Sequence, residues 1–148
     1  MIKLRKARRS ELKKFHQMEQ QSHVGDFLDP HSVELHQSRF ADSKTVYLSI
    51  ETEKKVLAGY IVLVEHSASN SLEFARVLID QSYRGIGQQA MKLMEEYGVR
   101  EFGVNRIWLD VYENNARGMH VYEKMGYRRF NQKKTGERIL YFYEKIFD

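Results

Sequence analysis

The stretch that decides the fold is Val77–Met94, with the sequence V-L-I-D-Q-S-Y-R-G-I-G-Q-Q-A-M-K-L-M. A short apolar run at Val77–Ile79 predicts a buried strand, and Gly85-Ile86-Gly87 breaks it before a helical pattern of apolar residues begins at Ala90. Such a junction points several unpaired backbone N–H groups and the positive end of a helix dipole at one spot. Because two glycines let a ligand come close to the backbone, the turn favours binding of a phosphate group.

The glycine turn by itself leaves two interpretations open. Gly-x-Gly also occurs at ordinary strand-to-helix turns, where it serves only the backbone conformation. The turn is not a phosphate loop of the Gly-Lys-Ser/Thr type, and Gln88–Ala90 supply no third glycine for a dinucleotide-binding fingerprint. A second motif is needed to decide between them.

The composition narrows the class of protein. A length of 148 residues fits one domain, residues 1–148. The absence of cysteine excludes disulfides, thiolate zinc sites and a cysteine nucleophile, and it suits a reducing cytoplasm. No apolar run is as long as a membrane span, and Met1–Arg5 does not resemble a signal peptide. We therefore expect a soluble, cytoplasmic protein with no membrane partner.

Positive charge is concentrated at the N-terminus. Residues 1–14 hold seven basic residues and one acid, a net charge of +6 in a chain whose total is +4. Such a cluster could bind nucleic acid, an acidic partner or a polyanionic cofactor, although runs of charged residues usually form only a solvent-exposed surface. No nucleic-acid-binding motif accompanies it, so nucleic acid is an unlikely partner.

The remainder of the chain alternates strands with helices. Strands are expected at Ile2–Leu4, Thr45–Ile50, Val56–Val64, Leu72–Ile79, Ile107–Val111, Tyr127–Phe130 and Ile139–Phe147. Helices are expected at Ser10–Glu19 with Ser10 as N-cap, Val33–Phe40, Gly87–Phe102 and Asn115–Met125. Because a helix joins the fourth strand to the fifth, these two should be parallel neighbours. The order predicts an α/β domain with a mixed central sheet and helices on both faces.

The second motif is W-L-D-V-Y-E-N-N-A-R-G-M-H-V-Y-E-K-M-G-Y, Trp108–Tyr127, which places Asn115, Tyr122 and Gly126 at fixed offsets on a strand, a loop and a helix. With this motif and the Arg84–Gly87 turn, the chain resembles the GNAT acetyltransferase superfamily over nearly its whole length. It departs from the family pattern at Ser82, where the family usually has Gln or Arg, and at Gly118, where the family prefers alanine.

The resemblance implies a GNAT-type three-layer fold, with about six to seven strands, a splayed parallel pair, and acetyl-CoA as cosubstrate. The backbone of Val77, Leu78 and Ile79 would then bind the pantetheine arm. The pyrophosphate would lie on backbone N–H groups of Arg84, Gly85, Ile86, Gly87 and Gln88. Asn115 would contact the cofactor near the pantetheine, and the Tyr122 hydroxyl would donate a proton to the leaving thiolate.

The chemistry also needs a base, because a lysine-like amine costs about 4.6 kcal/mol to deprotonate at pH 7, against about 1.4 kcal/mol for an α-amine. Glu73, on the strand before the turn, is the candidate. The alternative is an ordinary edge or ion-pairing glutamate, for which Arg76 is one candidate partner. Tyr122 likewise has a structural alternative, as a core residue beside Met119 and Met125. A backbone N–H of Val77 or Leu78 is the candidate for polarising the thioester carbonyl.

The resulting expectation is an N-acetyltransferase that transfers acetyl directly to a primary amine, which could be a protein α-amine, a polyamine or another small amine. The alternative is a catalytically inactive CoA-binding or nucleic-acid-binding module on the same fold. The family resemblance also allows a homodimer. No metal is expected, because His16, His23, His31 and His36 match no ligand spacing with Asp26 or Asp29. The resemblance instead implies that this region walls the acceptor pocket.

Overall fold

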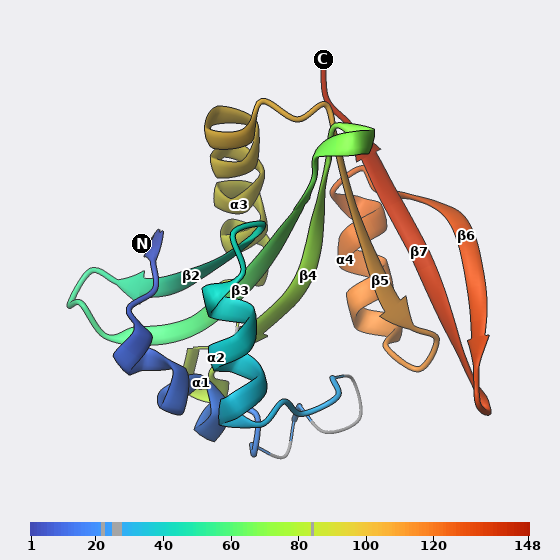
Figure 1. Cartoon of the computed structure of the whole chain (residues 1–148). Helices are drawn as coiled ribbons and strands as arrows, with labels where there is room; N and C mark the ends of the chain where they lie inside the picture. Colours follow the sequence, from blue (N-terminus) through green and yellow to red (C-terminus); the bar gives the residue numbers. More distant parts are fainter. Residues whose placement is uncertain (22, 25–27, 84) are drawn as a thin grey trace.

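One mixed sheet of seven strands, in the order β1-β2-β3-β4-β5-β7-β6, organises the computed structural model, which describes residues 1–21, 23–24, 28–83 and 85–148 (Figure 1). The strands are β1 (Ile2–Lys6), β2 (Thr45–Thr52), β3 (Leu57–His66), β4 (Ser71–Ile79), β5 (Arg106–Tyr112), β6 (Arg128–Thr135) and β7 (Arg138–Ile146). The helices are α1 (Leu12–Met18), α2 (Val33–Ala41), α3 (Gly87–Phe102) and α4 (Ala116–Lys124). The predicted α/β class is confirmed.

The parallel strands β4 and β5 meet only at their beginnings. Their paired residues are Ser71 with Arg106, Leu72 with Ile107, and Glu73 with Trp108. Beyond these pairs the two strands diverge, as Figure 1 shows, while β5 stays paired with β7 along its whole length. The predicted splayed parallel pair is confirmed.

A β-bulge at Ala75 interrupts β4, since Phe74 and Arg76 pair with the consecutive residues Val62–Leu63 of β3. In a regular strand, residues three apart point to opposite faces. The extra residue places Glu73 and Arg76 on the same face of the sheet, the face covered by α1 and α2.

Two apolar clusters pack on the two faces of the sheet, so the prediction of helices on both faces is confirmed. The cluster beneath α3 includes Leu48, Ile50, Ile61, Leu63, Leu72, Phe74, Met91, Met94, Ile107 and Leu109. The cluster beneath α1 and α2 includes Leu12, Phe15, Met18, Tyr47, Tyr60, Val62 and Leu78. We expected only alternate residues of β2 to point inward; because β2 is covered on both faces, Tyr47 and Ser49 are buried as well.

The expected N-cap at Ser10 is wrong. A short 3₁₀ turn, Arg9–Glu11, precedes α1, and the Glu11 carboxylate accepts the Arg8 backbone N–H at 2.8 Å. The same carboxylate accepts two hydrogen bonds from the Arg5 guanidinium, at 2.9 and 2.8 Å. These bonds lower the Glu11 pKa to about 2, although burial acts in the opposite direction. Part of the basic N-terminal charge is therefore paired within the fold.

The C-terminal hairpin is longer than the sequence pattern indicated. β6 runs through the polar residues up to Thr135, where only Tyr127–Phe130 was expected to be a strand. All eight residues of β6 are exposed, because it is the edge strand, so no apolar alternation marks its full length. Among the described residues, no helix has the length and apolar character needed to cross a membrane.

We predict that Gly59→Ala destabilises the fold. Gly59 lies on β3 opposite Ile79, and a Cβ at this position would come within 2.2 Å of the Leu78 carbonyl oxygen. Overpacking of this kind should lower the free energy of unfolding by about 1–3 kcal/mol, measured by denaturant titration. The control is Gly87→Ala, whose Cβ would meet nothing within 4 Å. Equal stability of Gly59→Ala and wild type would contradict the prediction.

Candidate active site

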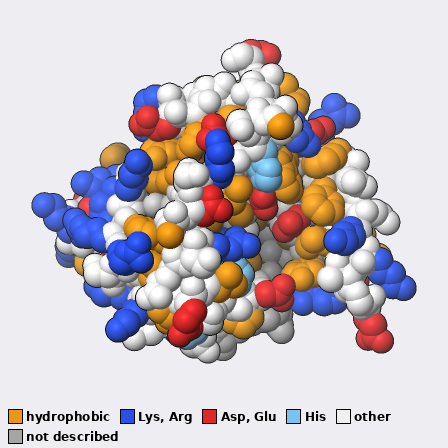
Figure 2. Space-filling model, viewed as in Figure 1, with side chains coloured by type: hydrophobic (Ala, Val, Ile, Leu, Met, Phe, Trp, Pro, Cys, Tyr) orange, Lys and Arg blue, Asp and Glu red, His pale blue; other side chains and the backbone are white. Residues whose placement is uncertain are grey.

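A cavity of about 860 Å³ lies where β4 and β5 separate. Figure 2 shows this hollow at the centre of the molecule, with acidic and apolar side chains around it. The predicted site residues that line it are Glu73, Val77, Leu78, Ile79, Gly85, Gly87, Gln88, Asn115 and Tyr122. Ile86 does not line the cavity but is the N-cap residue of α3, and Arg84 lies outside the described residues.

The inner edge of β4 presents backbone groups to the cavity. Asp80 N–H donates to the Ala58 carbonyl at 2.8 Å, directly beyond the paired residues Gly59 and Ile79. By the alternation of an antiparallel ladder, the N–H and C=O of Val77 and Ile79 turn away from β3, toward the gap, whereas those of Leu78 face β3. His23 Nε2–H donates to the Ile79 carbonyl at 2.9 Å. The Val77 N–H and C=O are thus available to a ligand.

The glycine turn opens the N-terminus of α3 onto the cavity. Gly85 has φ +100°, a conformation that favours glycine. The first intrahelical bond runs from Ala90 N–H to the Ile86 carbonyl at 2.9 Å, so the N–H groups of Gly87 and Gln88 have no partner within the helix. A Cβ on Gly85 or Gly87 would meet nothing within 4 Å, which leaves room for an anion against these amides.

Asn115 is the N-cap of α4. Its side-chain oxygen accepts the Gly118 backbone N–H at 2.9 Å, so its amide N–H groups are the donors that can face the cavity. A Cβ at Gly118 would come within 2.6 Å of this amide. The close fit explains a glycine at a position where alanine would favour the helix.

Tyr122 projects from α4 into the cavity wall. It is partly exposed and lines the cavity, and among the described residues its hydroxyl has no hydrogen-bond partner. Burial, with a smaller contribution from the charge of Asp110, raises the Tyr122 pKa to about 12. The phenol is therefore neutral at physiological pH and free to donate a hydrogen bond.

Three carboxylates from three different segments line one end of the cavity: Glu73 on β4, Asp110 on β5 and Asp29 between α1 and α2. Asp110 is exposed to the open cavity. Desolvation by the surrounding cavity walls, followed by the negative charges of Glu73 and Asp29, raises its pKa to about 6. Asp29 accepts a hydrogen bond from the Tyr112 hydroxyl at 3.0 Å. Asp110 was not among the site residues predicted from the sequence; its one signal there is an acid that interrupts an otherwise apolar strand.

Glu73 pairs with His66 and not with Arg76, which the sequence offered as its partner. The Glu73 carboxylate accepts a hydrogen bond from His66 Nε2–H at 2.9 Å. Arg76 instead lies within 3.4 Å of the Glu19 carboxylate and donates from Nε to the Tyr60 hydroxyl at 2.9 Å. The bulge places both side chains on one face, yet each has a different partner.

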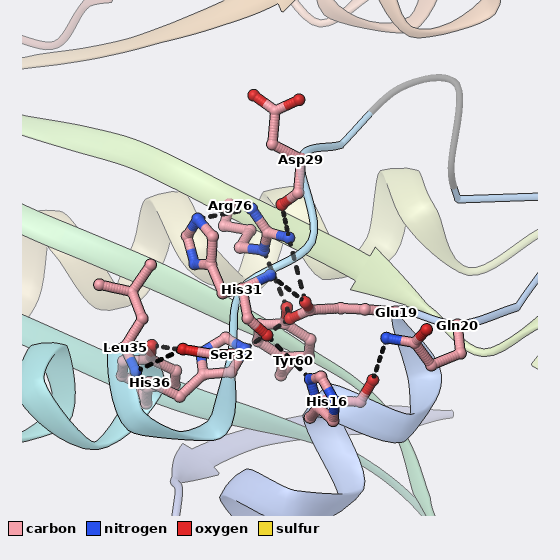
Figure 3. A network of polar contacts seen from close by, with 11 residues as sticks. His16, Glu19, Gln20, Asp29, His31, Ser32, Leu35, His36, Tyr60 and Arg76 are labelled. Atoms are coloured by element: carbon pink, nitrogen blue, oxygen red, sulfur yellow. Dashed lines mark hydrogen bonds and ion pairs between the residues drawn. The ribbon is translucent and has the colours of Figure 1, made fainter.

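The Glu19–Arg76 pair belongs to a buried network that holds the segment carrying Asp29 (Figure 3). Glu19 accepts the His31 backbone N–H at 2.7 Å, and Arg76 donates to the Asp29 carbonyl. His36 is fully buried and bonds to Glu19 in the same network. In the described part of the chain, no three His, Asp or Glu side chains are grouped to hold a metal ion.

The comparisons with known proteins agree with this geometry. The model of the acetyltransferase (GNAT) family matches residues 12–127. The chain therefore belongs to the GNAT family, and it is an acetyl-CoA-dependent N-acetyltransferase.

Its named relatives act on polyamines. It is 25% identical over 135 residues to spermidine N(1)-acetyltransferase of Escherichia coli (strain K12), covering 85% of this chain and 72% of that protein. It is 26% identical over 104 residues to spermine/spermidine N(1)-acetyltransferase of Bacillus subtilis (strain 168), covering 66% and 68%. The structure of spermidine N-acetyltransferase from Vibrio cholerae in complex with CoA and spermine has a TM-score of 0.84 at 19% identity, covering 98% and 95%. That likeness confirms the GNAT fold.

We predict that Asp110→Asn removes a low-pH limb from the activity profile. With an Asp110 pKa of about 6, this carboxyl is charged above pH 6 and neutral below it. In the wild type, kcat/KM should fall as the pH drops through 6; in Asp110→Asn, kcat/KM should be lower throughout and lack that step. Glu113→Gln, a matched change at an exposed carboxylate, should keep the wild-type profile. A step near pH 6 that persists in Asp110→Asn assigns the titration to another group.

Proposed function

We propose that this enzyme acetylates a primary amine of a polyamine. The observation that carries the proposal is the acidic end of the cavity, where Glu73, Asp110 and Asp29 converge from three segments. A polyamine has several ammonium groups to place against these carboxylates, whereas a protein α-amine has one. The names of the bacterial relatives support the same substrate class.

The cofactor is proposed to lie along the inner edge of β4. Its pantetheine amides would bond to the backbone of Val77, and its pyrophosphate would lie against the amides of Gly85–Gln88 at the N-terminus of α3. Asn115 would donate its amide N–H to the pantetheine. This arrangement directs the thioester toward Tyr122 on one side and the acidic end of the cavity on the other.

In the proposed reaction, the amine first loses a proton, directly or through a water, to a carboxylate. Glu73 keeps the role that the sequence suggested, and Asp110 is a second candidate, because a carboxyl with a pKa of about 6 is a better base near neutral pH. The amine nitrogen then attacks the thioester carbon, with the Val77 N–H polarising the carbonyl. The carbon–sulfur bond breaks, and CoA leaves as the thiolate.

Tyr122 would assist the leaving sulfur chiefly as a hydrogen-bond donor. Its pKa of about 12 lies roughly 3.5 units above that of a cysteine-like thiol, which makes complete proton transfer about 4.8 kcal/mol uphill. A hydrogen bond from the phenol still stabilises negative charge on sulfur as the bond breaks. Its contribution to the rate should accordingly be modest.

We predict that Tyr122→Phe lowers kcat by about 10²-fold, the weaker end of the range for acid–base groups. The KM for acetyl-CoA and the melting temperature should change little, because the ring and its packing against Tyr127 and Tyr143 remain. The measurement is thiol release, with single-turnover kinetics to establish that chemistry limits the rate. Tyr97→Phe on α3 is the matched control. An unchanged kcat under chemistry-limited conditions excludes this role.

The substrate class is tested with a panel of amines. We expect kcat/KM to fall in the order spermine, spermidine, diaminobutane, butylamine, by about tenfold for each ammonium lost, which corresponds to about 1.4 kcal/mol. Asp29→Asn should reduce the differences in kcat/KM between these amines. Asp42→Asn, which lies outside the cavity, is its control. A peptide with a free α-amine that is acetylated faster than spermidine would overturn the polyamine assignment.

A further inference from the structure

A second hollow, of about 310 Å³, lies over β5, β7 and β6, on the sheet face that carries Glu73. Four aromatic side chains form a continuous wall. The ring centroids are 5.4 Å apart for His66 and Trp108, 6.3 Å for Trp108 and Phe142, and 6.2 Å for Phe142 and Phe130. No role in the reaction proposed above uses this wall.

Glu73 joins the two hollows. Its carboxylate lines the large cavity and also bonds to His66, which lines the second hollow. Glu73 pairs in register with Trp108, and Trp108 with Glu144 of β7. With neighbouring strands about 4.8 Å apart, Glu73 and Glu144 are separated by roughly 10 Å across the sheet.

Charged groups of both signs border the second hollow. Arg106 lines the hollow and is paired with Glu144, with Nε 2.7 Å from the carboxylate. The Glu73 carboxylate, which bonds to His66, borders the hollow on the side of the large cavity. The Arg106 guanidinium itself lies 4.9 Å from the centroid of Phe130. A cation is therefore already accommodated on this wall, as the electron-rich ring faces would favour.

We propose that this hollow binds the ammonium group of the acceptor that is farthest from the reacting amine, against Trp108 and Phe142. The inference rests on the proposed polyamine substrate and assigns its orientation. An extended triamine with spacers of three and four methylenes spans roughly 11 Å, at about 1.25 Å per bond. That length carries a chain from the acidic end of the large cavity, past Glu73, onto the aromatic wall.

The chain provides its own probe of this hollow, because Trp108 is the sole tryptophan. Spermidine added to the CoA-bound protein should change the Trp108 emission saturably, with a midpoint near its KM. Butylamine, which has no second ammonium, should leave the emission unchanged up to the same fraction of its own KM. Phe142→Leu retains Trp108 and should weaken the spermidine titration by about three- to tenfold.

Kinetics provide the second test. Phe142→Leu and Phe130→Leu should each raise the KM for spermidine by about three- to tenfold, with kcat and the KM for butylamine unchanged. Phe130 is 42% exposed, so its replacement should not unfold the protein. Phe102→Leu on α3, which lines neither hollow, is the matched control.

The outcomes separate this inference from the proposed function. If wild type acetylates spermidine but neither the emission nor the KM responds, the orientation is wrong and the polyamine assignment stands. If no polyamine is acetylated, the proposed function is wrong, and the substrate orientation inferred from it is wrong as well. If Phe130→Leu changes the sedimentation coefficient and leaves the KM for spermidine unchanged, the aromatic wall is an interface between copies of the chain, which overturns the inference.

Discussion

The separation of β4 and β5 is the constraint on which the rest of the structure depends. Buried backbone N–H and C=O groups need hydrogen-bond partners, and a parallel neighbour normally supplies them. Here β5 remains paired with β7 while β4 remains paired with β3, so the inner edge of β4 faces a cavity. An extended ligand with amide groups can satisfy that edge as a strand would. The fold thus converts an unpaired strand edge into a binding surface.

Two local features turn this opening into a reaction site. The glycine turn places the N-terminus of α3 at the end of β4, where its free amides suit the charged end of the cofactor. The bulge at Ala75 brings Glu73 to the proposed acceptor side of the cavity, while Arg76 anchors the segment that carries Asp29. In the proposed arrangement, the cofactor and the acceptor enter the cavity from opposite ends, with Tyr122 on the α4 wall between them.

Much of the fold and part of the site could be predicted because local patterns carry them. The strand, the glycine turn and the following helix are contiguous, and Gly103 ends α3 in the left-handed conformation that glycine favours. The N-cap at Ser10 failed because Glu11, held by Arg5 from β1, bonds the turn instead. The extent of β6 was missed because an exposed edge strand has no apolar alternation.

The sequence by itself determined the order of elements, the glycine turn between β4 and α3 and the family, since these depend on contiguous residues and on periodicity. Only the tertiary structure decided which acids share the cavity. Asp29, Glu73 and Asp110 lie on segments far apart in the chain, and their proximity follows from strand order, the bulge and the buried Glu19–Arg76 pair. Pairing between distant segments has no local signature, because neither its partners nor its register can be read from one stretch of chain.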